Sequence, residues 1–420
     1  MTVVHVLRKY NPAEWGGTES ALQRLFAGLR PTGVNNLVYC PRGPVVPSQD
    51  PLAQSGCTIK RFRACVPIWG ISREQKQQMI AVGGNLLSFD LLAALWRESE
   101  ISVMHTHALG RLGGIALSAA KTRRVPCVVT IHGGVLDIPD QLKESFEQPS
   151  GGFEWGKLFG LLLQSRRVLA DADAVITCNA READRLQEKF PGKRVHVQPH
   201  GVPIDTFAYD HKARADEAFP ALRNKQLLLC VGRIDPVKNQ LWLVERMPAI
   251  TRSHPDVLLV LAGACTDEKY GEMVRRRIRE LALDERVILT GGFGPGDSRL
   301  IGLMQRSLAV LLPSISETFG LVILEAWAAG TAVISSGTSG ASALIRPGQN
   351  GWLFELESPE SFLRAIDELL ANHPLRQRMA AAGHQLARSQ YDTSVVAGKV
   401  RDLYGQLIEE KNALRHSARR

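Results

Sequence analysis

The sequence places two carboxylates on either side of a predicted helix start. Glu317 lies in a polar turn that follows the apolar run 308–312, which predicts a buried strand. Glu325 lies about two turns into the helix that is predicted after Gly320. Carboxylates in these positions can accept hydrogen bonds from the hydroxyl groups of a sugar. Taken alone, two glutamates eight residues apart are more typical of a solvated helix face.

The same helix start predicts an anion site. Phe319 and Gly320 open the helix, so their backbone N–H groups have no helical partner and would point at a ligand beyond the strand. Arg233 directly follows another predicted strand, and Lys238 lies five residues further on. Such a pair can clamp a diphosphate and stabilise it as it leaves. The alternative is a pair of surface cations, which the neighbouring phosphate site disfavours.

Histidines and glycines mark strand ends in the first half of the chain. His105 and His107 in the segment MHTHA, and His132 with Gly133 in TIHGG, each end an apolar run. His107 and His132 can hydrogen-bond a polar substrate, although they can also have structural roles. Metal binding is the alternative, but no carboxylate stands at ligand spacing, so no metal is expected. The pair Gly16–Gly17 would let a ligand approach the backbone closely, although Gly-Gly is also typical of a plain turn.

Two further motifs are set aside because of their context. Asp171-Ala172-Asp173 spells the D-x-D triplet with which metal-dependent transferases hold a sugar nucleotide, but it lies between a helix and an apolar strand. The run 291–296 lacks the last glycine of a dinucleotide fingerprint, because Asp297 stands there. This run can serve as a loop near a nucleobase instead.

These residues need a scaffold that aligns strand ends, and the chain predicts two. Apolar strand-like runs alternate with helical patterns in both halves, which predicts parallel sheets with helices on both faces. We therefore expect an α/β protein with doubly wound domains at 1–210 and 211–390 and a ligand cleft between them. The turn-rich segment 199–225 predicts the linker, and 135–152 predicts a mobile loop facing the cleft.

Composition narrows the class of protein. The 420 residues are 45% hydrophobic and 22% charged, as in soluble proteins of more than one domain. Most of the net charge of +9 falls before residue 215, which suits an anionic membrane surface or an acidic substrate, while no nucleic-acid-binding motif is found. Seven scattered cysteines predict reduced thiols. Without a signal peptide or a long apolar segment, the protein is expected to be cytoplasmic, at the inner face of the membrane.

Taken in order, the Gly-Gly loop, H-x-H, HG, GR…K and E-x7-E motifs resemble the retaining glycosyltransferases of family 4, which have the GT-B fold. The similarity extends from Val3 to about Tyr404. Its most specific part is ETFGLVILE, followed by AWAAGTAVISS and PGQNGWLF. The resemblance implies two Rossmann-like domains, the first for the acceptor and the second for the nucleotide-sugar donor. The segment YDTSVVAGKVRDLYGQLI resembles the helix that crosses back, so 391–420 are expected to pack on the first domain.

The resemblance also implies a role for each candidate residue. Arg233 and Lys238 would hold the donor diphosphate, Glu317 the hydroxyls of the donor sugar, and Glu325 the ribose. His132 would lie beside the donor sugar at the reacting face. Further donor contacts would come from Gly16, Gly17, Gly263, Phe319, Gly320 and Leu321, and the acceptor side would include His107 and Gly133. Such enzymes typically work without a metal, so no cofactor is expected.

Three positions depart from the family pattern. Ala343 stands where a Glu is usual in a GG-x-P-E motif, and Asn179 where a Ser is common. Asn239 follows Lys238 where a Gly is usual. None of the three removes a donor-binding group named above.

The sequence therefore predicts a glycosyltransferase that moves a sugar from a UDP- or GDP-linked donor to a hydroxyl of a glycan or lipid-linked acceptor. Cell-surface polysaccharide or glycolipid biosynthesis is the expected setting, with peripheral association to an anionic membrane. Two alternatives stay open. A sugar-nucleotide 2-epimerase of the same architecture would convert the donor alone, and a non-catalytic partner would bind the sugar nucleotide without turnover.

Overall fold

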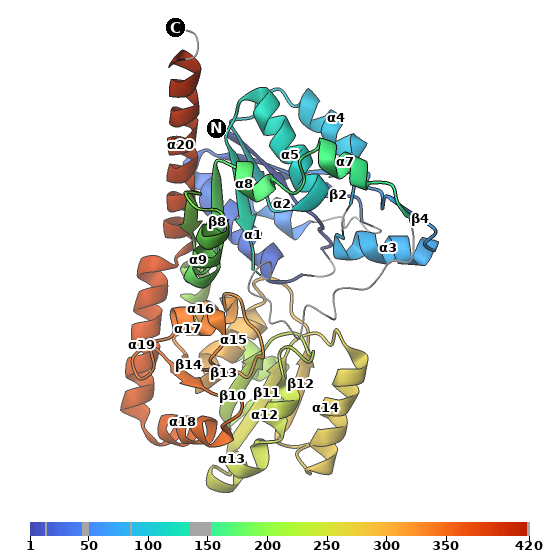
Figure 1. The fold of residues 1–420 in the computed structure, drawn as a ribbon. Coiled ribbons are helices and arrows are strands. Elements are labelled where there is room, and N and C mark those ends of the chain that lie inside the picture. Colours follow the sequence, from blue (N-terminus) through green and yellow to red (C-terminus); the bar gives the residue numbers. More distant parts are fainter. Residues whose placement is uncertain (13–14, 44–49, 85, 134–152, 418–420) are drawn as a thin grey trace. The chain divides into compact units, whose positions relative to one another are not determined.

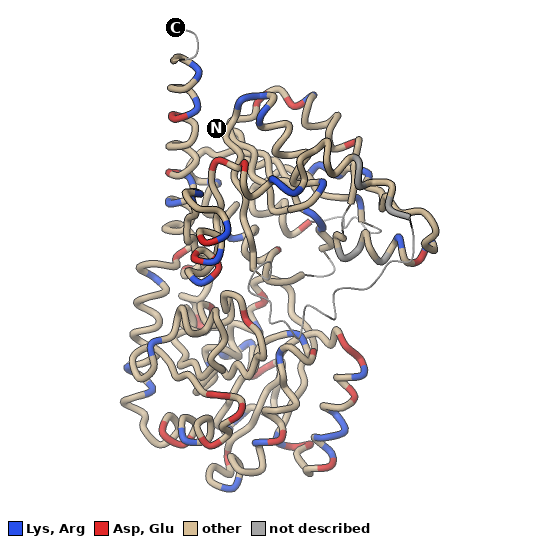
Figure 2. The backbone as a smooth tube through the Cα atoms, in the orientation of Figure 1, with Lys and Arg blue, Asp and Glu red and all other residues tan. Residues whose placement is uncertain are grey.

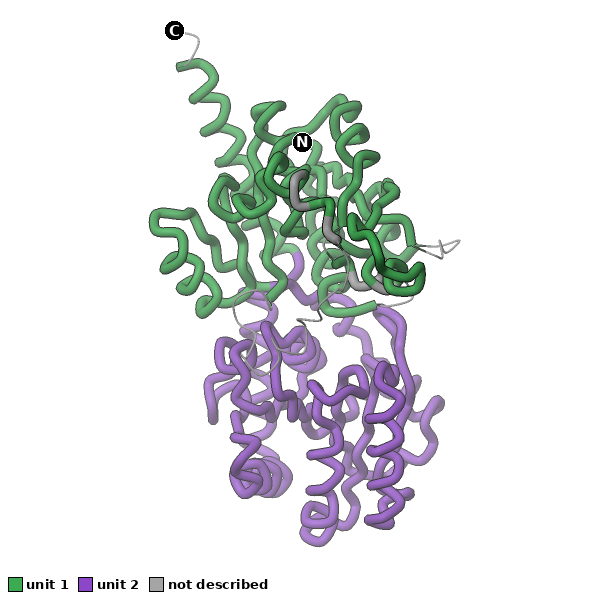
Figure 3. The backbone as a smooth tube through the Cα atoms, turned by 45° about the vertical axis from the view of Figure 1, so that its right-hand side comes forward, with its two compact units in different colours: residues 1–199, 394–420 green, residues 200–393 purple. Residues whose placement is uncertain are grey.

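The computed structural model describes residues 1–12, 15–43, 50–84, 86–133 and 153–417. The chain forms two compact units, which Figure 3 shows in separate colours. Unit 1 comprises Met1–Pro199 and Ser394–Arg420, and unit 2 comprises His200–Thr393. The expected boundary after residue 210 falls inside unit 2 of this division. The loop expected at 135–152 lies outside the described residues.

Unit 1 is built on a seven-stranded sheet whose neighbouring strands all pair in parallel. The strand order is β3-β2-β1-β5-β6-β8-β9, so the chain order reverses between β1 and β5. The strands are β1 (Thr2–Val6), β2 (Asn35–Pro41), β3 (Cys57–Phe62), β5 (Val103–Thr106), β6 (Cys127–Ile131), β8 (Ala174–Thr177) and β9 (Val195–Val197). Apolar runs predicted six of these strands, because parallel strands are buried on both faces, but they did not predict β3, whose sequence CTIKRF includes Thr, Lys and Arg.

Helices cover both faces of this sheet (Figure 1). On one face, Val4 and Val6 of β1 pack with α4 (Phe89–Arg97) and α5 (Gly110–Arg123). On the other, Val3 packs with α1 (Gly17–Leu29) and with the carboxyl-terminal helix α20 (Thr393–Ser417). The chain thus returns to unit 1 through α20, which confirms the predicted crossing helix. The remaining elements of unit 1 are η1 (Arg30–Thr32), α2 (Pro51–Gln54), α3 (Arg73–Val82), α7 (Lys157–Leu162), α8 (Val168–Asp171), α9 (Ala180–Lys189) and the antiparallel pair β4 (Ile68–Trp69) and β7 (Phe153–Glu154).

Unit 2 has a six-stranded parallel sheet in the order β12-β11-β10-β13-β14-β15. Its strands are β10 (Gln226–Val231), β11 (Val257–Ala262), β12 (Val287–Gly291), β13 (Ala309–Leu312), β14 (Ala332–Ser336) and β15 (Trp352–Phe354). Its helices are α10 (Ile204–Phe207), α11 (Lys212–Ala218), η2 (Pro220–Leu222), α12 (Gln240–Val244), α13 (Met247–Ser253), α14 (Glu268–Glu280), α15 (Ser298–Arg306), α16 (Leu321–Ala328), α17 (Ser339–Leu344), α18 (Pro359–Ala371) and α19 (His373–Gln390). Two parallel α/β sheets confirm the predicted fold class.

The helical patterns over 241–250 and 158–169 each predict one continuous helix, but the structure divides both. The pattern over 241–250 forms α12 and α13, because Pro248 in the first turn of α13 cannot donate an N–H to the preceding turn. The pattern over 158–169 forms α7 and α8. Between these helices Gln164 has a positive φ of 51°, which a right-handed helix does not contain. The prediction of a single helix was wrong at both places.

Charge is distributed unevenly between the units. The excess of Lys and Arg over Asp and Glu belongs to unit 1, whereas the two classes nearly balance in unit 2, where α14 carries both signs (Figure 2). Within the described ranges, no helix is both long enough and apolar enough to span a membrane.

Candidate active site

The strand order of unit 2 brings together two loops that lie far apart in the sequence. β10 and β13 are neighbours, with Leu228 opposite Ala309 in the register. The chain order reverses between these two strands, and open α/β sheets commonly bind ligands at the carboxyl ends of strands at such a reversal. The backbone N–H of Ile315 donates to the carbonyl oxygen of Val237 at 2.8 Å, which ties the two loops together.

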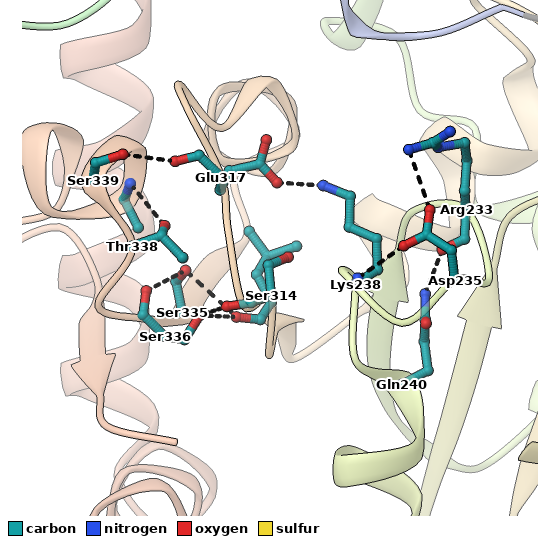
Figure 4. A network of polar contacts seen from close by, with 12 residues as sticks. Arg233, Asp235, Lys238, Gln240, Ser314, Glu317, Ser335, Ser336, Thr338 and Ser339 are labelled. Carbon is teal, nitrogen blue, oxygen red and sulfur yellow. Dashed lines mark hydrogen bonds and ion pairs between the residues drawn. The ribbon is translucent and has the colours of Figure 1, made fainter. Parts of the chain in front are cut away.

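Lys238 and Glu317 meet across these loops as an ion pair (Figure 4). Their side chains are 20% and 23% exposed, so the pair is partly buried but open to a ligand. The backbone N–H of Lys238 donates to Oδ1 of Asp235 at 3.0 Å, which fixes the loop beneath the ammonium group. If the pair separates, the ammonium can bind a phosphate and the carboxylate can accept sugar hydroxyls.

Arg233 extends from the same loop with a side chain that is 58% exposed. Its Nη2 lies 3.2 Å from Oδ2 of Asp235, and its carbonyl oxygen accepts a hydrogen bond of 2.7 Å from Nε2 of Gln240 (Figure 4). The buried Asp235 therefore contacts both the guanidinium group of Arg233 and the backbone of Lys238. An exposed guanidinium fork suits bidentate contacts to phosphate oxygens.

Glycine is needed where β11 ends beside this loop. A Cβ atom at Gly263 would lie 1.9 Å from the carbonyl oxygen of Gly232, a distance that no real contact reaches. Gly263 thus permits the close approach of β11 to the residues that carry Arg233. Close packing against Gly232 therefore explains why this position, a predicted site residue, requires a glycine.

The start of α16 is shaped by its neighbours. Gly320 is the N-cap residue with φ of 91°, a left-handed conformation that favours glycine. The adjacent Phe319 is buried, and its ring packs edge-on against His200 at 4.9 Å between centroids. Glu325 lies in the second turn of α16 and is partly buried. The first backbone N–H groups of α16 follow directly from Gly320, as the sequence predicted.

The start of α17 supports Glu317, and sequence reasoning missed this contact. The backbone N–H of Gly340 donates to the carbonyl oxygen of Glu317 at 2.8 Å. Oγ of Ser339 donates to the same oxygen at 3.3 Å (Figure 4). A Cβ atom at Gly340 would lie 2.5 Å from the backbone nitrogen of Phe319. Gly340, which matches the second glycine of the family's GG-x-P-E motif, is the signal that could have identified the contact.

In unit 1, the predicted residues His107 and His132 follow the carboxyl ends of β5 and β6, and His5 of β1 joins them. Nδ1 of His107 lies 2.8 Å from Nε2 of His132, and Nε2 of His107 lies 3.1 Å from Nδ1 of His5. Nε2 of His5 in turn lies 3.1 Å from Oδ1 of the buried Asn36. Burial lowers the pKa of His5 to about 3 and that of His132 to about 4, so these rings are neutral at pH 7.

His105 makes two hydrogen bonds to residues other than these histidines. Its Nδ1 lies 2.6 Å from the hydroxyl of Tyr404 on α20, and its Nε2 lies 2.6 Å from Oγ1 of Thr130. His5, His105 and His107 have ring nitrogens within 4.8 Å of one another, a spacing that could hold a metal ion. However, both ring nitrogens of His5 and of His105 already face polar partners, so the residues fit a hydrogen-bond network better than a metal site.

The remaining predicted motifs of unit 1 are the two glycine positions and the D-x-D triplet. Gly16 is the N-cap residue of α1, and its N–H donates to Oε2 of Glu19 at 3.1 Å. Gly133 follows His132 with a positive φ of 102°. The two carboxylates of the D-x-D triplet lie near the amino ends of β6 and β8, away from the histidines. Asp171 forms an ion pair with Lys121, and Asp173 accepts a hydrogen bond of 2.8 Å from the backbone N–H of Cys127.

Two family models match the chain. Residues 16–201 match the glycosyl transferase 4-like domain, and residues 212–386 match the glycosyl transferases group 1. Glycogen synthase from Mycobacterium tuberculosis is 28% identical over 96% of this chain and 94% of its own length. A UDP-Gal:alpha-D-GlcNAc-diphosphoundecaprenol alpha-1,3-galactosyltransferase from Escherichia coli is 25% identical over 76% of this chain and 79% of its own.

The fold is shared with solved structures at low sequence identity. HepE from Anabaena, solved in complex with UDP, superimposes with a TM-score of 0.72 and 18% identity, covering 97% of this chain and 100% of HepE. A complex of HepE with UDP-glucose gives the same TM-score of 0.72. The solved structures and the paired α/β sheets show the GT-B fold. The two family models together match most of the chain, which therefore belongs to the group 1 glycosyltransferases, with a glycosyl transferase 4-like domain in unit 1 and a group 1 domain in unit 2.

Proposed function

We propose that this glycosyltransferase transfers a sugar, with retention of the anomeric configuration, from a nucleotide diphosphate to a hydroxyl of a glycan or lipid-linked acceptor. The observation that carries the proposal is the Lys238–Glu317 ion pair beside Arg233 at the reversal point of the unit 2 sheet. These groups match a ligand in which a diphosphate adjoins a sugar. Unit 2 would bind the donor, and unit 1 would supply the acceptor side through His107, His132 and Gly133.

UDP is the nucleotide that we favour over GDP. HepE has been solved in complex with UDP and with UDP-glucose, and the relative from Escherichia coli is named for a UDP-galactose donor and a diphosphoundecaprenol acceptor. The excess of positive charge in unit 1 suits a lipid-linked acceptor at an anionic membrane surface. We therefore propose a cytoplasmic enzyme that binds the membrane peripherally.

In the proposed reaction, the donor diphosphate replaces Glu317 as the partner of Lys238, and Glu317 turns to the sugar hydroxyls. The bond between the anomeric carbon and the phosphate oxygen breaks, and negative charge collects on the departing phosphate. Arg233, Lys238 and the N–H groups at the start of α16 stabilise that charge. The acceptor oxygen bonds to the anomeric carbon from the same face, and its proton passes to the departing phosphate oxygen. All the positive charge in this scheme comes from the chain, so we propose that no metal is needed.

A donor screen tests the proposal. UDP- and GDP-sugars are added in EDTA, and both thermal stabilisation and slow release of free sugar are measured. We expect one nucleotide class to stabilise the protein and to release its sugar. A new sugar nucleotide formed from the donor alone would favour the 2-epimerase, and stabilisation without turnover would favour the non-catalytic partner. Stabilisation by none of the sugar nucleotides would overturn the proposal.

The role of Arg233 is tested by Arg233→Ala. With donor at saturation, we expect turnover to fall by about a hundredfold, since a group that stabilises the departing charge is lost. Arg252→Ala is the matched control, because Arg252 is exposed in the last turn of α13, which precedes the amino end of β11 in the same sheet. Equal turnover in the two variants would refute the proposed clamp.

A further inference from the structure

The rings of His5, His107 and His132 meet edge to edge. The ring centroids of His5 and His107 are 5.4 Å apart with planes inclined by 18°, and those of His107 and His132 are 5.0 Å apart with planes inclined by 25°. The facing nitrogens are 3.1 and 2.8 Å apart. Nearly coplanar rings with nitrogens at these distances are joined by hydrogen bonds in the ring planes. The three imidazoles therefore form a continuous line from β1 through β5 to the end of β6.

Each contact along this line holds one proton. A neutral imidazole donates from one nitrogen and accepts at the other, and burial keeps His5 and His132 neutral. If the proton of His5 is on Nδ1, it points at Nε2 of His107, whose own proton must then be on Nδ1 and point at Nε2 of His132. The opposite arrangement places all three protons on Nε2. The three rings consequently share one tautomer.

Asn36 ends the line. Its side-chain amide faces Nε2 of His5 at 3.1 Å, and the residue is fully buried on β2. An amide presents an oxygen on one side and an NH2 group on the other, so its orientation decides whether Nε2 of His5 donates or accepts. The orientation of Asn36 is thereby coupled to the ring of His132, although the two residues do not touch.

We propose that Asn36, His5 and His107 are positioning residues that set the tautomer of His132. This inference rests on the proposed function, in which His132 lies beside the reacting sugar. The line determines whether Nδ1 of His132 acts as a donor or as an acceptor toward a sugar hydroxyl. Neither His5 nor Asn36 needs to contact the substrate for this purpose.

The test is spectroscopic and does not depend on turnover. Protein labelled with 15N-histidine gives long-range proton–nitrogen spectra that distinguish the two neutral tautomers, and single His variants assign the signals. We expect His5, His107 and His132 to be neutral at pH 7 and to show the same tautomer. A wild-type spectrum in which neighbouring rings have opposite tautomers would overturn the proposal.

His5→Phe then tests the coupling. Phenylalanine keeps the aromatic contact with Phe26 but removes both nitrogens. We expect the signals of His107 and His132 to change together, into the other tautomer or into exchange between the two. Asn36→Leu gives a second, isosteric variant with the same expected result. An unchanged tautomer of His132 in a folded variant would overturn the coupling.

Tyr404→Phe is the matched control, because it removes a buried hydrogen bond from His105 without touching the line. We expect it to lower thermal stability while the three tautomers stay as in the wild type. In kinetics, His5→Phe should lower kcat by about tenfold with the donor KM unchanged, as expected for one misplaced hydrogen bond in the transition state. If the wild type shows no transfer at all, the proposed function fails while the spectra still decide the coupling.

Discussion

Glu317→Gln should bind the bare nucleotide diphosphate more tightly than the wild type does. In the free protein Lys238 is paired with Glu317, and the diphosphate must break that pair before it can bind the ammonium group. Glutamine leaves the geometry nearly unchanged but removes the negative charge. The variant therefore has a Lys238 that is ready for the phosphate, and the site loses a charge that repels it.

The magnitude follows from the burial of the pair. Exposed ion pairs contribute about 0.2–1 kcal/mol, and with side chains only 20% and 23% exposed this pair belongs at the upper end. Release from a pair worth about 1 kcal/mol corresponds to roughly fivefold tighter binding. The complete sugar nucleotide should behave differently, because a charge-assisted hydrogen bond to a sugar hydroxyl is worth about 1.5–3 kcal/mol and is weakened in the variant.

Titration calorimetry with UDP and with the UDP-sugar that the donor screen selects measures both effects. We expect Glu317→Gln to gain affinity for UDP, to lose affinity for the UDP-sugar, and to show a smaller gain at high salt, where surface electrostatics are screened. Glu245→Gln controls for net charge, since Glu245 lies in another ion pair of unit 2, with Arg246. Equal or weaker binding of UDP by Glu317→Gln would refute the exchange of partners.

Three further outcomes are expected. Gly263→Ala should lower the free energy of unfolding by about 2 kcal/mol or more and weaken nucleotide binding, because the added Cβ would lie 1.9 Å from the Gly232 oxygen; an unchanged denaturant midpoint would contradict this. Gly340→Ala should lower kcat by displacing Glu317 through the contact at the Phe319 nitrogen, and an unaltered kcat would show that the loop adapts. The free energy of unfolding should fall as the pH drops from about 6.5 toward 4, by up to about 1.4 kcal/mol per pH unit for each histidine, because His5 and His132 become protonated in the unfolded chain but stay neutral when buried. In chemical unfolding, His5→Phe should show a weaker dependence of stability on pH, and an identical slope would disprove the assignment.

Much of the fold followed from local patterns. Apolar runs predicted most of the strands, because a parallel sheet buries both faces of each strand. The unit around Gly320 was predicted from an apolar run that is followed by a polar turn and a helical pattern. Breaks inside helical patterns were harder to predict. Pro248 gave a visible signal, whereas the positive φ of Gln164 depends on the packing of α7 and α8 and has no signature in the residue type.

The sequence allowed candidate residues to be named, but it could not predict the contacts between them. The pairing of Lys238 with Glu317 depends on the neighbourhood of β10 and β13, which only the strand order establishes. His5 was missed because it stands inside an apolar strand, where a histidine looks like an ordinary core residue. Its register opposite His105 on β5 is a property of the sheet alone. The family resemblance suggested a role for each candidate residue, whereas the strand order determined which residues contact one another.

The return of α20 to unit 1 has a consequence for the order in which the chain folds. Unit 2 is a single uninterrupted stretch, whereas the core of unit 1 includes Val400, Tyr404 and Leu407 from α20. On the ribosome, the face of the first sheet next to Val3 stays exposed until these last side chains emerge. The second unit is therefore expected to complete its core before the first. Loss of the carboxyl-terminal helix would leave the amino-terminal core open.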